Sequence, residues 1–457
     1  MFHPVVFREY DIRGVYNQDF DLEFAFLLGK AFAKYVFDRT GADHPRITLG
    51  YDARNSSPDI IKSLARGLVQ SGSHVVHLGM VTTPISYYST FALANVRGSI
   101  MVTGSHNPPN YNGFKISLGN TTIFGDEIQD LKKIIQKGEF LSGQGTETEI
   151  DILTPYLQRY KEEFGTLKPV KVVVDCGNGA AGVIVRKLYE SLGLQPIILF
   201  EEPDGNFPNH HPDPTIEKNL TALAAKVRET GAAVGIGFDG DADRIGVVDH
   251  TGRMILGDEL IIIFGRNIAK KIPGSKIIGD VKCSDRLYSD LAKFGAKPIM
   301  WKSGHSLIKG KIKKEGAPFG GEMSGHVFFA DRNYGYDDAP YAGLRLLEIL
   351  SETGKDIPQL LEGLPSSYAT PEIRIDTTEE KKIAVVNKLK EVFPQNCDEY
   401  QINTLDGIRV SFDNGWALAR ASNTQPVLVV RFESNTPEGL ATIQSRFEKV
   451  IDPVLNG

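Results

Sequence analysis

Cysteine is scarce in this sequence. Only three cysteines, Cys176, Cys283 and Cys397, occur among 457 residues, and they are far apart and odd in number. This usage argues against a disulfide framework and favours a reducing compartment. No Cys-x-x-Cys or Cys/His spacing suggests a zinc site, so the cysteines indicate neither a disulfide-rich scaffold nor a zinc protein.

Long apolar runs and basic tracts are also missing. The apolar run "LIIIFG" (260–265) falls well short of the ~20 residues that a membrane span needs. The first residues, "MFHPVVFREYDIRG", carry charges early and lack the apolar stretch of a signal peptide. With 51 Lys and Arg against 57 Asp and Glu, the formal net charge is −6, which disfavours nucleic acid as a partner. We therefore expect a cytoplasmic enzyme or binding protein with no membrane or nucleic-acid partner.

The first ~360 residues alternate short β-branched runs with amphipathic helical stretches, which predicts βαβ units and mainly parallel sheets. One order of predicted elements recurs three times along the chain. Each repeat begins with a strand, a Gly/Asp turn and a helix, continues with a second strand, and closes with a third strand that ends in a polar loop. We interpret this order as three related α/β domains with mixed, mainly parallel sheets. The polar loops end the segments 98–107, 232–244 and 317–326.

Short strands between helices mark the last ~90 residues as a separate, smaller α+β domain. Strands are predicted at 371–376, 406–412, 415–421 and 426–434, and helices at 377–393 and 436–451. Four domains agree with a length of 457 residues, which is too great for one ordinary hydrophobic core. The predicted domains are 1–151, 152–253, 254–366 and 367–457.

Three aspartates at alternate positions, Asp239, Asp241 and Asp243, follow the third strand of the second predicted domain in "FDGDADR". If this segment curls as a loop, the three carboxylates can converge on a hard cation such as Mg²⁺. A calcium EF-hand is excluded, because Arg244 and His250 stand where that loop requires Gly and Glu. A solvated acidic turn is the alternative.

The segment "TGSHNPPNYNGFK" (103–115) ends the equivalent strand of the first domain. It could be an ordinary turn, since Gly, Ser, Asn and Pro all favour turns. Beside the aspartates, however, Ser105 is a candidate phosphoserine that donates its phosphoryl group next to a divalent ion. His106 could orient the loop, move a proton or be a structural histidine. Lys115 could supply positive charge, or act as a base if its pKa is depressed.

Two further polar loops suit a phosphorylated sugar. In "GGEMSGH" (320–326), a carboxylate and a hydroxyl at alternate positions match sugar hydroxyls, which both donate and accept hydrogen bonds. In "RASNT" (420–424), a guanidinium, hydroxyls and an amide have the composition of a phosphate site. Near the start, "FREYDIRG" places Arg8 and Arg13 around Tyr10, where exposed ion pairs with neighbouring acids are the alternative. Either loop alone could be an ordinary turn.

The motif "GNGAAG" (177–182) is a literal G-x-G-x-x-G between a strand and a helical stretch, with Glu201 and Glu202 near the end of the next strand. That is much of a dinucleotide-binding fingerprint. Asp175 weighs against it, because its carboxylate would face the pyrophosphate. Small residues also have a simpler role here, since they permit a sharp turn and close helix packing.

The four loops "TGSHNPP", "DGDADR", "GEMSGH" and "RASNT" occur in a fixed order, and together they resemble the α-D-phosphohexomutase superfamily, most closely its bacterial phosphomannomutase/phosphoglucomutase group. The resemblance spans nearly the whole chain, from "YDIRG" to "RFES". It implies three related α/β domains and a smaller C-terminal α+β domain around a central cleft, in agreement with the repeat pattern.

The resemblance also implies residue roles. Ser105 matches the phosphorylated serine that gives and receives the phosphoryl group. The aspartate triad of "DGDADR" matches the Mg²⁺ ligands, with a phosphoserine oxygen from Ser105 completing the set. Arg13 and Lys115 match residues that take part in general acid/base catalysis and charge stabilisation near the transferred group, and His106 lies beside the serine. The candidate substrate-binding residues are Tyr10, Arg244, Lys282, His305, Glu322, Ser324, His326, Arg420, Ser422, Asn423 and Thr424.

The implied reaction moves a phosphoryl group between C1 and C6 of mannose and glucose phosphates through phospho-Ser105 and a 1,6-bisphosphate intermediate. The implied cofactors are Mg²⁺ and an activating hexose 1,6-bisphosphate, and the implied partners are small-molecule hexose phosphates, with the chain a monomer or weak dimer. A phosphoglucosamine mutase is one alternative, although that branch usually has Gln where Met323 stands. A non-catalytic sugar-phosphate-binding protein and a metal-dependent phosphatase are the others.

Overall fold

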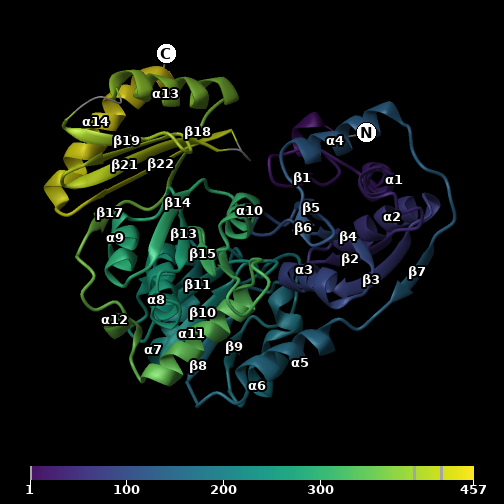
Figure 1. Ribbon diagram of the computed structural model, residues 1–457, viewed down its shortest axis with the longest axis horizontal. Coiled ribbons are helices and arrows are strands. Elements are labelled where there is room, and N and C mark those ends of the chain that lie inside the picture. The colour runs from purple at the N-terminus through teal and green to yellow at the C-terminus, as the bar shows by residue number, and fades with distance from the viewer. Residues whose placement is uncertain (1–2, 395–397, 423–425, 457) are drawn as a thin grey trace.

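Four β-sheets follow one another along the chain, each with helices packed against it (Figure 1). The structure is a computed structural model and describes residues 3–394, 398–422 and 426–456. The first three sheets mix parallel and antiparallel strand pairs, and the strand pairs of the fourth are antiparallel. This confirms the predicted fold class. In the described part of the chain, no helix combines the length and the apolar character that crossing a bilayer requires.

The first domain has a sheet in the order β1-β5-β4-β2-β3-β7, with β6 paired to β5. Its strands are β1 (Ile12–Val15), β2 (Arg46–Tyr51), β3 (His74–Met80), β4 (Val96–Val102), β5 (Tyr111–Leu118), β6 (Thr121–Thr122) and β7 (Thr146–Glu149). Its helices are the 3₁₀ helix η1 (Pro4–Val6), α1 (Leu22–Thr40), α2 (Ser57–Gln70), α3 (Thr83–Ala92) and α4 (Asp126–Lys137). The longest of them, α1, starts at an Asp21 cap and ends at Gly41 in the left-handed conformation.

The second domain has the sheet order β12-β11-β10-β8-β9. Its strands are β8 (Val172–Asp175), β9 (Ile197–Leu199), β10 (Val234–Phe238), β11 (Ile245–Asp249) and β12 (Met254–Ile255). Its helices are α5 (Leu153–Phe164), η2 (Ala180–Val183), α6 (Val185–Ser191), η3 (Glu217–Leu220) and α7 (Thr221–Thr230). Strands β8 and β10 are buried throughout, which explains their continuous apolar runs.

The third domain has the sheet order β14-β13-β15-β16. Its strands are β13 (Lys276–Asp280), β14 (Lys297–Trp301), β15 (Phe319–Gly321) and β16 (Val327–Phe329). Its helices are α8 (Gly257–Lys271), α9 (Asp285–Lys293), α10 (His305–Glu315), α11 (Ala339–Thr353) and α12 (Ile357–Leu360). Helix α11 is buried along most of its length and packs on both the second and the third sheets. The predicted domain boundaries stay predictions.

The C-terminal domain has the sheet order β17-β22-β21-β20-β19, with β18 also paired to β22. Its strands are β17 (Tyr368–Ala369), β18 (Ile373–Asp376), β19 (Tyr400–Asn403), β20 (Ile408–Phe412), β21 (Gly415–Ala421) and β22 (Val427–Ser434), and its helices are α13 (Glu379–Val392) and α14 (Pro437–Asn456). The four predicted strands and two predicted helices are confirmed, whereas the short strands β17 and β19 were not predicted from the sequence.

One strand arrangement is common to the three α/β domains and sets the position of the predicted loops. In each domain the third parallel strand turns back into an antiparallel neighbour, giving the pairs β4–β5, β10–β11 and β15–β16. The turns of these hairpins are the segments that contain Ser105, Asp239 and Glu322. The three loops therefore leave their sheets at equivalent points.

One hydrophobic cluster joins the three α/β domains, while most of the first domain and the fourth domain each enclose a cluster of their own. One buried cluster runs from Tyr88 in the first domain through Ile236 to Phe319 in the third. The C-terminal domain encloses its own cluster around Leu428 and Phe447. In Figure 1 this domain (yellow) lies beside the third sheet and apart from the purple and blue first domain.

A buried tryptophan between two arginines joins the third and fourth domains. The guanidinium carbons of Arg409 and Arg431 lie 3.7 and 5.4 Å from the ring centroid of Trp416. Arg409 donates hydrogen bonds to the backbone carbonyls of Val281 and Cys283, and Arg431 donates to the carbonyl between them. This joint therefore combines hydrogen bonds to one short segment after β13 with a small apolar cluster of Val281, Trp416 and Leu418.

Asp338 connects the second and third domains inside the main core. Its carboxylate caps α11 by accepting from the Tyr341 N–H at 2.9 Å, and it also accepts from the hydroxyls of Tyr160 (2.6 Å) and Tyr156 (3.0 Å) of α5. Burial raises the pKa of Asp338 to about 6, against an ordinary value of 3.8, although these hydrogen bonds oppose the shift. The native state therefore binds a proton at Asp338 more tightly than the unfolded chain does.

We predict that ionisation of Asp338 makes the protein less stable as the pH rises from about 4 to 6. In this window the folded state holds more protons than the unfolded state, so the slope of stability against pH is negative. Asp338→Asn should remove a fall on the order of 2–3 kcal/mol, measured by urea unfolding across this pH range. Asp356→Asn, which changes the half-buried cap of α12, is the matched control. Identical pH slopes for Asp338→Asn and the unsubstituted protein would contradict the prediction.

Candidate active site

The three hairpin loops meet, and their backbones touch. A Cβ atom at Gly240 would lie 2.4 Å from the carbonyl oxygen of Ser105, so only glycine permits this approach of the aspartate loop to the serine loop. Arg244 and His326 form an isolated antiparallel bridge between the aspartate loop and the third-domain loop. The equivalent hairpins of three domains thus build one site.

Ser105 is held in an uncommon conformation. It is 2% exposed, and its φ of 48° lies in the left-handed region, which costs a non-glycine residue about 1–3 kcal/mol. Its N–H donates to the Thr103 hydroxyl at 2.8 Å. Its Oγ donates to Asp239 at 2.8 Å and lies 3.2 Å from Nδ1 of His106. The conformation therefore aims the serine hydroxyl at the aspartates.

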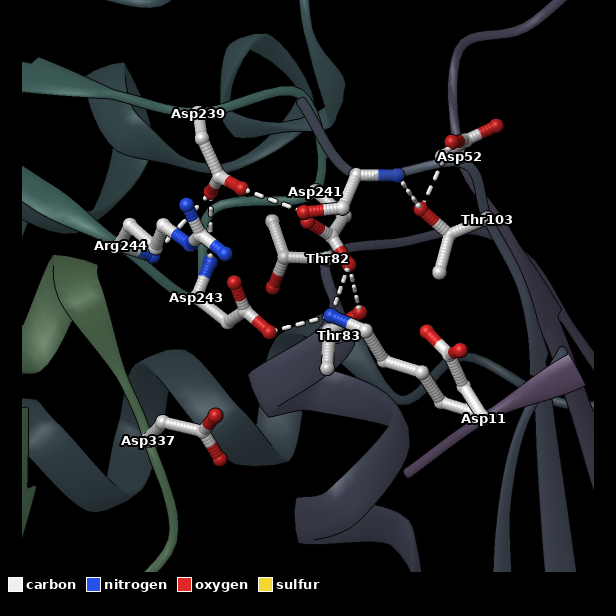
Figure 2. Close-up of polar contacts among 12 residues, drawn as sticks. Asp11, Asp52, Thr82, Thr83, Thr103, Asp239, Asp241, Asp243, Arg244 and Asp337 are labelled. Atoms are coloured by element: carbon white, nitrogen blue, oxygen red, sulfur yellow. Dashed lines mark hydrogen bonds and ion pairs between the residues drawn. The ribbon is translucent and has the colours of Figure 1, made fainter. Parts of the chain in front are cut away.

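The aspartate loop curls so that its three carboxylates converge, as the spacing of the residues predicts (Figure 2). One ligand oxygen from each of Asp239, Asp241 and Asp243 lies within 4.8 Å of the others, and all three residues are fully buried. Ala242 adopts a φ of 58°, which turns the chain inside the loop. Asp239 also accepts hydrogen bonds from the N–H groups of Asp243 and Arg244, each at 3.1 Å.

The donor set fits a divalent cation. Among the described residues, Asp241 Oδ1 and Asp243 Oδ1 are buried without a hydrogen-bond partner. Lys115 donates to Asp241 at 2.6 Å and also to Asp243, and Thr83 donates to Asp241 at 2.5 Å. Unpaired carboxylate oxygens in a dry pocket, together with the serine oxygen, are the hard ligands that Mg²⁺ prefers.

Charge coupling in this cluster sets its pKa values. Burial, reinforced by Asp241 and Asp243, raises the pKa of Asp239 well above its ordinary value. Burial alone would raise the pKa of Asp241, but Lys115 outweighs burial and lowers it. Burial alone would lower the pKa of Lys115, but Asp241 and Asp243 outweigh burial and raise it. This favours a charged Lys115 over a lysine base.

His106 and Arg13 stand on the other side of the serine loop. Burial, together with the charges of Arg244 and Arg13, lowers the pKa of His106 well below its ordinary value, so its ring is neutral at neutral pH. Arg13 donates to Asn107 at 2.7 Å and to Asp11 at 2.5 Å. An ion pair with Asp11 is thus present, but it is largely buried and not the exposed pair that the sequence left as an alternative, and Arg13 at the same time holds the serine loop.

His326 lies in a chain of polar contacts that the sequence did not predict. Arg244 Nε donates to His326 Nε2 at 3.0 Å, so the ring proton is on Nδ1, which lies 3.0 Å from Asp337. Lys309 pairs with Asp337 at 3.0 Å, and the ring of His305 stacks on that of His326 at 5.5 Å. Asp337 is fully buried beside these groups.

The predicted sugar loop presents a carboxylate whose orientation is fixed. Glu322 Oε1 accepts from the Gly304 N–H at 2.6 Å, while its Oε2 is buried without a hydrogen-bond partner among the described residues. Burial raises the pKa of Glu322, although His326 and Lys282 oppose the shift. Lys282 pairs with Glu372 of the C-terminal domain at 3.0 Å, and Ser324 is half-buried in the same loop as Glu322.

The predicted phosphate loop extends from β21 next to the third domain. Arg420 Nε donates to Asp406 at 3.0 Å, and Asp406 also accepts from the Ser303 N–H at 3.1 Å. Tyr10 of the first domain donates to the carbonyl of the same Ser303 at 3.0 Å. Lys382 donates to the Ser422 carbonyl at 2.6 Å. The remaining predicted phosphate residues, Asn423 and Thr424, lie outside the described residues.

The G-x-G-x-x-G motif supports the aspartate loop. The Ala180 N–H donates to the Gly240 carbonyl at 2.9 Å, so the turn packs directly on that loop. Asp175 accepts from the Gly177 N–H at 2.8 Å and lies 3.0 Å from His210. These contacts agree with the structural explanation of the motif and place a carboxylate where a pyrophosphate would bind.

Several residues of the site carry no motif of their own. Thr83, Asp337 and the pair Asp52 and Arg54 contact the predicted residues from other segments. A signal was available for two of them, because Asp52 and Arg54 directly follow β2, at the strand end where ligands of α/β sheets bind.

Models of one protein family match all four domains. They describe phosphoglucomutase/phosphomannomutase alpha/beta/alpha domains I, II and III, at residues 4–142, 154–252 and 256–368, and the C-terminal domain, at residues 372–450. The four-domain fold and the buried serine–aspartate site define a phosphohexomutase. The chain belongs to the phosphoglucomutase/phosphomannomutase family.

Similar proteins extend over almost the full length. The chain is 46% identical to a phosphomannomutase/phosphoglucomutase from Pseudomonas aeruginosa over 449 residues, which cover 98% of this chain and 96% of the relative. It is 43% identical to a phosphoglucomutase from Neisseria gonorrhoeae over 451 residues, with the same coverage of 98% and 96%. The crystal structure of a phosphoglucomutase/phosphomannomutase family protein from Burkholderia thailandensis has a TM-score of 0.92 and 41% identity, covering 99% of this chain and 98% of that chain.

We predict that Asp241→Asn weakens binding of a divalent cation more than the ~10–100-fold that loss of an outer contact typically costs. The substitution replaces a buried carboxylate oxygen that has no hydrogen-bond partner among the described residues. Isothermal titration with Mg²⁺ or Mn²⁺ measures the affinity, and Asp204→Asn, in the same domain and outside the cluster, is the control. Equal affinities of the two variants would mean that the triad does not hold the ion.

Proposed function

We propose that this phosphohexomutase reversibly moves a phosphoryl group between C1 and C6 of mannose phosphate and glucose phosphate, through phospho-Ser105 and a hexose 1,6-bisphosphate. The observation that carries the proposal is the 2.8 Å contact of Ser105 Oγ with Asp239, inside a buried group of three carboxylates. The names of the relatives, which include both phosphomannomutase and phosphoglucomutase, support the choice of sugars.

Electrostatic stabilisation of the transferring group is the main task of this site. Mg²⁺ bound by Asp239, Asp241 and Asp243, with an oxygen of phospho-Ser105, would supply positive charge next to that group. Lys115 adds a second positive charge, because its pKa is raised and its ammonium lies against the same carboxylates. Loss of one such contact typically costs about 10²–10³-fold in rate.

His106 and Arg13 have different tasks beside the serine. His106 moves the serine proton, and Arg13 holds the serine loop and adds positive charge. The neutral ring of His106, with Nδ1 at 3.2 Å from Ser105 Oγ, can accept the serine proton as a phosphoryl group arrives on that oxygen. The same proton returns to the serine when the group leaves. Arg13, tied to the loop through Asn107, contributes positive charge beside the sugar hydroxyl that attacks.

The bisphosphate intermediate must turn end for end, so that each of its phosphates can face Ser105. Glu322 and Ser324 bind the sugar hydroxyls that lie between the two phosphates, and Tyr10, Arg244, Lys282, His305 and His326 complete the surroundings of the sugar. The phosphate that is not transferring binds at the loop formed by Arg420, Ser422, Asn423 and Thr424. One sugar loop and one phosphate loop thus serve both orientations, and added hexose 1,6-bisphosphate restores phosphate to an enzyme that has lost it.

We predict that Ser105→Ala abolishes turnover while leaving the fold intact, because the acceptor oxygen is lost and no core side chain changes. A coupled mutase assay measures turnover, and intact-protein mass spectrometry measures phosphate taken up from glucose 1,6-bisphosphate. Ser63→Ala removes a buried hydroxyl of the same domain and should keep full activity. Normal turnover by Ser105→Ala would remove this serine from the mechanism.

We predict comparable kcat/KM for mannose 1-phosphate and glucose 1-phosphate and a much lower value for glucosamine 1-phosphate. The assay contains Mg²⁺ and a trace of glucose 1,6-bisphosphate, and free phosphate is monitored in parallel. Preference for the amino sugar would indicate a phosphoglucosamine mutase despite Met323. Continuous release of free phosphate would indicate a phosphatase, and binding without turnover a silent sugar-phosphate-binding protein.

A further inference from the structure

A buried arginine holds the loop that contains Ser105. Arg54 is 1% exposed, and its two terminal nitrogens donate hydrogen bonds to four backbone carbonyls of this loop. The acceptors are the carbonyls of Ser105 (2.8 Å), Asn107 (2.5 Å), Pro108 (2.5 Å) and Tyr111 (2.9 Å). These bonds use all four N–H groups of the terminal nitrogens, so the guanidinium fork is fully engaged.

Three neighbouring residues keep the guanidinium group of Arg54 in place. Its Nε lies 3.2 Å from Asp52, which also accepts from the Thr103 hydroxyl at 2.8 Å and the Gly104 N–H at 3.1 Å. A Cβ at Gly104 would lie 2.4 Å from Arg54 Nε, so glycine lets the guanidinium lie against the backbone. The ring of Phe207, from the second domain, covers it at 5.3 Å from Cζ.

These contacts fix the peptide that directs the serine hydroxyl. The Ser105 carbonyl is bound by Arg54 and lies against the backbone of Gly240, while the Ser105 φ of 48° points Oγ toward Asp239. Without external support a serine would leave this left-handed conformation. The four carbonyl contacts supply that support.

Arg54 contacts backbone carbonyls of the Ser105 loop and not the hydroxyl that would carry phosphate. Phosphorylation changes the charge of a serine by about −1.5 to −2, so contacts to the phosphate itself come and go during a reaction cycle. The backbone carbonyls stay neutral throughout. The hydrogen-bond acceptors of Arg54 are therefore the same groups in both states, unlike those of cations that face the phosphoryl group.

We propose that Arg54 is a positioning residue for phosphoryl transfer, which keeps the Ser105 loop in its transfer geometry in the phosphorylated and the free enzyme. This inference rests on the proposed function. Charge alone does not suffice for the role, because a lysine ammonium is a single point with three donors and cannot bond four carbonyls arranged around a planar fork.

The test compares Arg54→Lys with Gly104→Ala, which keeps the arginine but pushes its guanidinium away. Both variants should lose about 10²-fold in kcat, the size expected for a misplaced reacting group, with KM unchanged within about twofold. Both should also take up phosphate from glucose 1,6-bisphosphate more slowly in a single turnover. Arg46→Lys, which alters an arginine bonded to one carbonyl in the same domain, is the control and should keep wild-type kinetics.

Chemical rescue separates positioning from general loss of structure. Guanidinium ion added to Arg54→Ala should restore part of the lost kcat, whereas it should not change the control. Wild-type kcat in Arg54→Lys would overturn the inference. So would a loss of kcat that equals the loss of folded protein and is accompanied by a higher KM. If Arg54→Lys does not fold, Gly104→Ala decides between these results, and absence of turnover in the unsubstituted enzyme would count against the proposed function instead.

Discussion

Three buried aspartates, Asp239, Asp241 and Asp243, bring like charges close together, and the neighbouring groups compensate this charge. Lys115 compensates part of the charge from the first domain, and the N–H groups that follow Asp239 compensate another part from within the loop. The compensation is incomplete, since two carboxylate oxygens of the cluster remain without a hydrogen-bond partner in the part of the chain described. The fold thus leaves negative charge uncompensated at this point, and a cation is most strongly attracted where repulsion between fixed charges is greatest.

The carboxylates repel one another, so the surrounding fold must be rigid enough to keep them close together. The three α/β domains supply this rigid frame because one hydrophobic cluster contains residues of all three, so their hairpin loops cannot separate without exposing apolar surface. Close contacts between the loops add precision to this frame, as where Gly240 meets the Ser105 carbonyl. A repeated unit that turns back at the same strand therefore places Ser105, the aspartate loop and the Glu322 loop around one point.

The sequence allowed prediction of those parts of the site that are local in the chain. The spacing of the aspartates and the composition of the serine loop were sufficient, because each acts within one hairpin. The role of Lys115 stayed open between a charge and a base, since the carboxylates that raise its pKa come from another domain. Asp337 and Arg54 were missed for the same reason. Their partners lie far away in sequence. Asp337 has no local pattern that marks it, and the place of Arg54 just after β2 indicates a ligand-facing strand end but not a contact with the serine loop.

The separate core of the C-terminal domain has a consequence for how the molecule opens. Its main apolar cluster is separate, and the joint around Trp416 binds the segment after β13 through arginine bonds to carbonyls and a small apolar cluster of Val281, Trp416 and Leu418. Parting this joint exposes little of the shared core. Amide hydrogen exchange should therefore divide the protein into two cooperative units, with the backbone of β20 to β22 exchanging as one group and the strands of the first three sheets as another. Arg420, at the end of β21, belongs to the unit that can open alone, while the serine and the aspartates belong to the unit that stays closed.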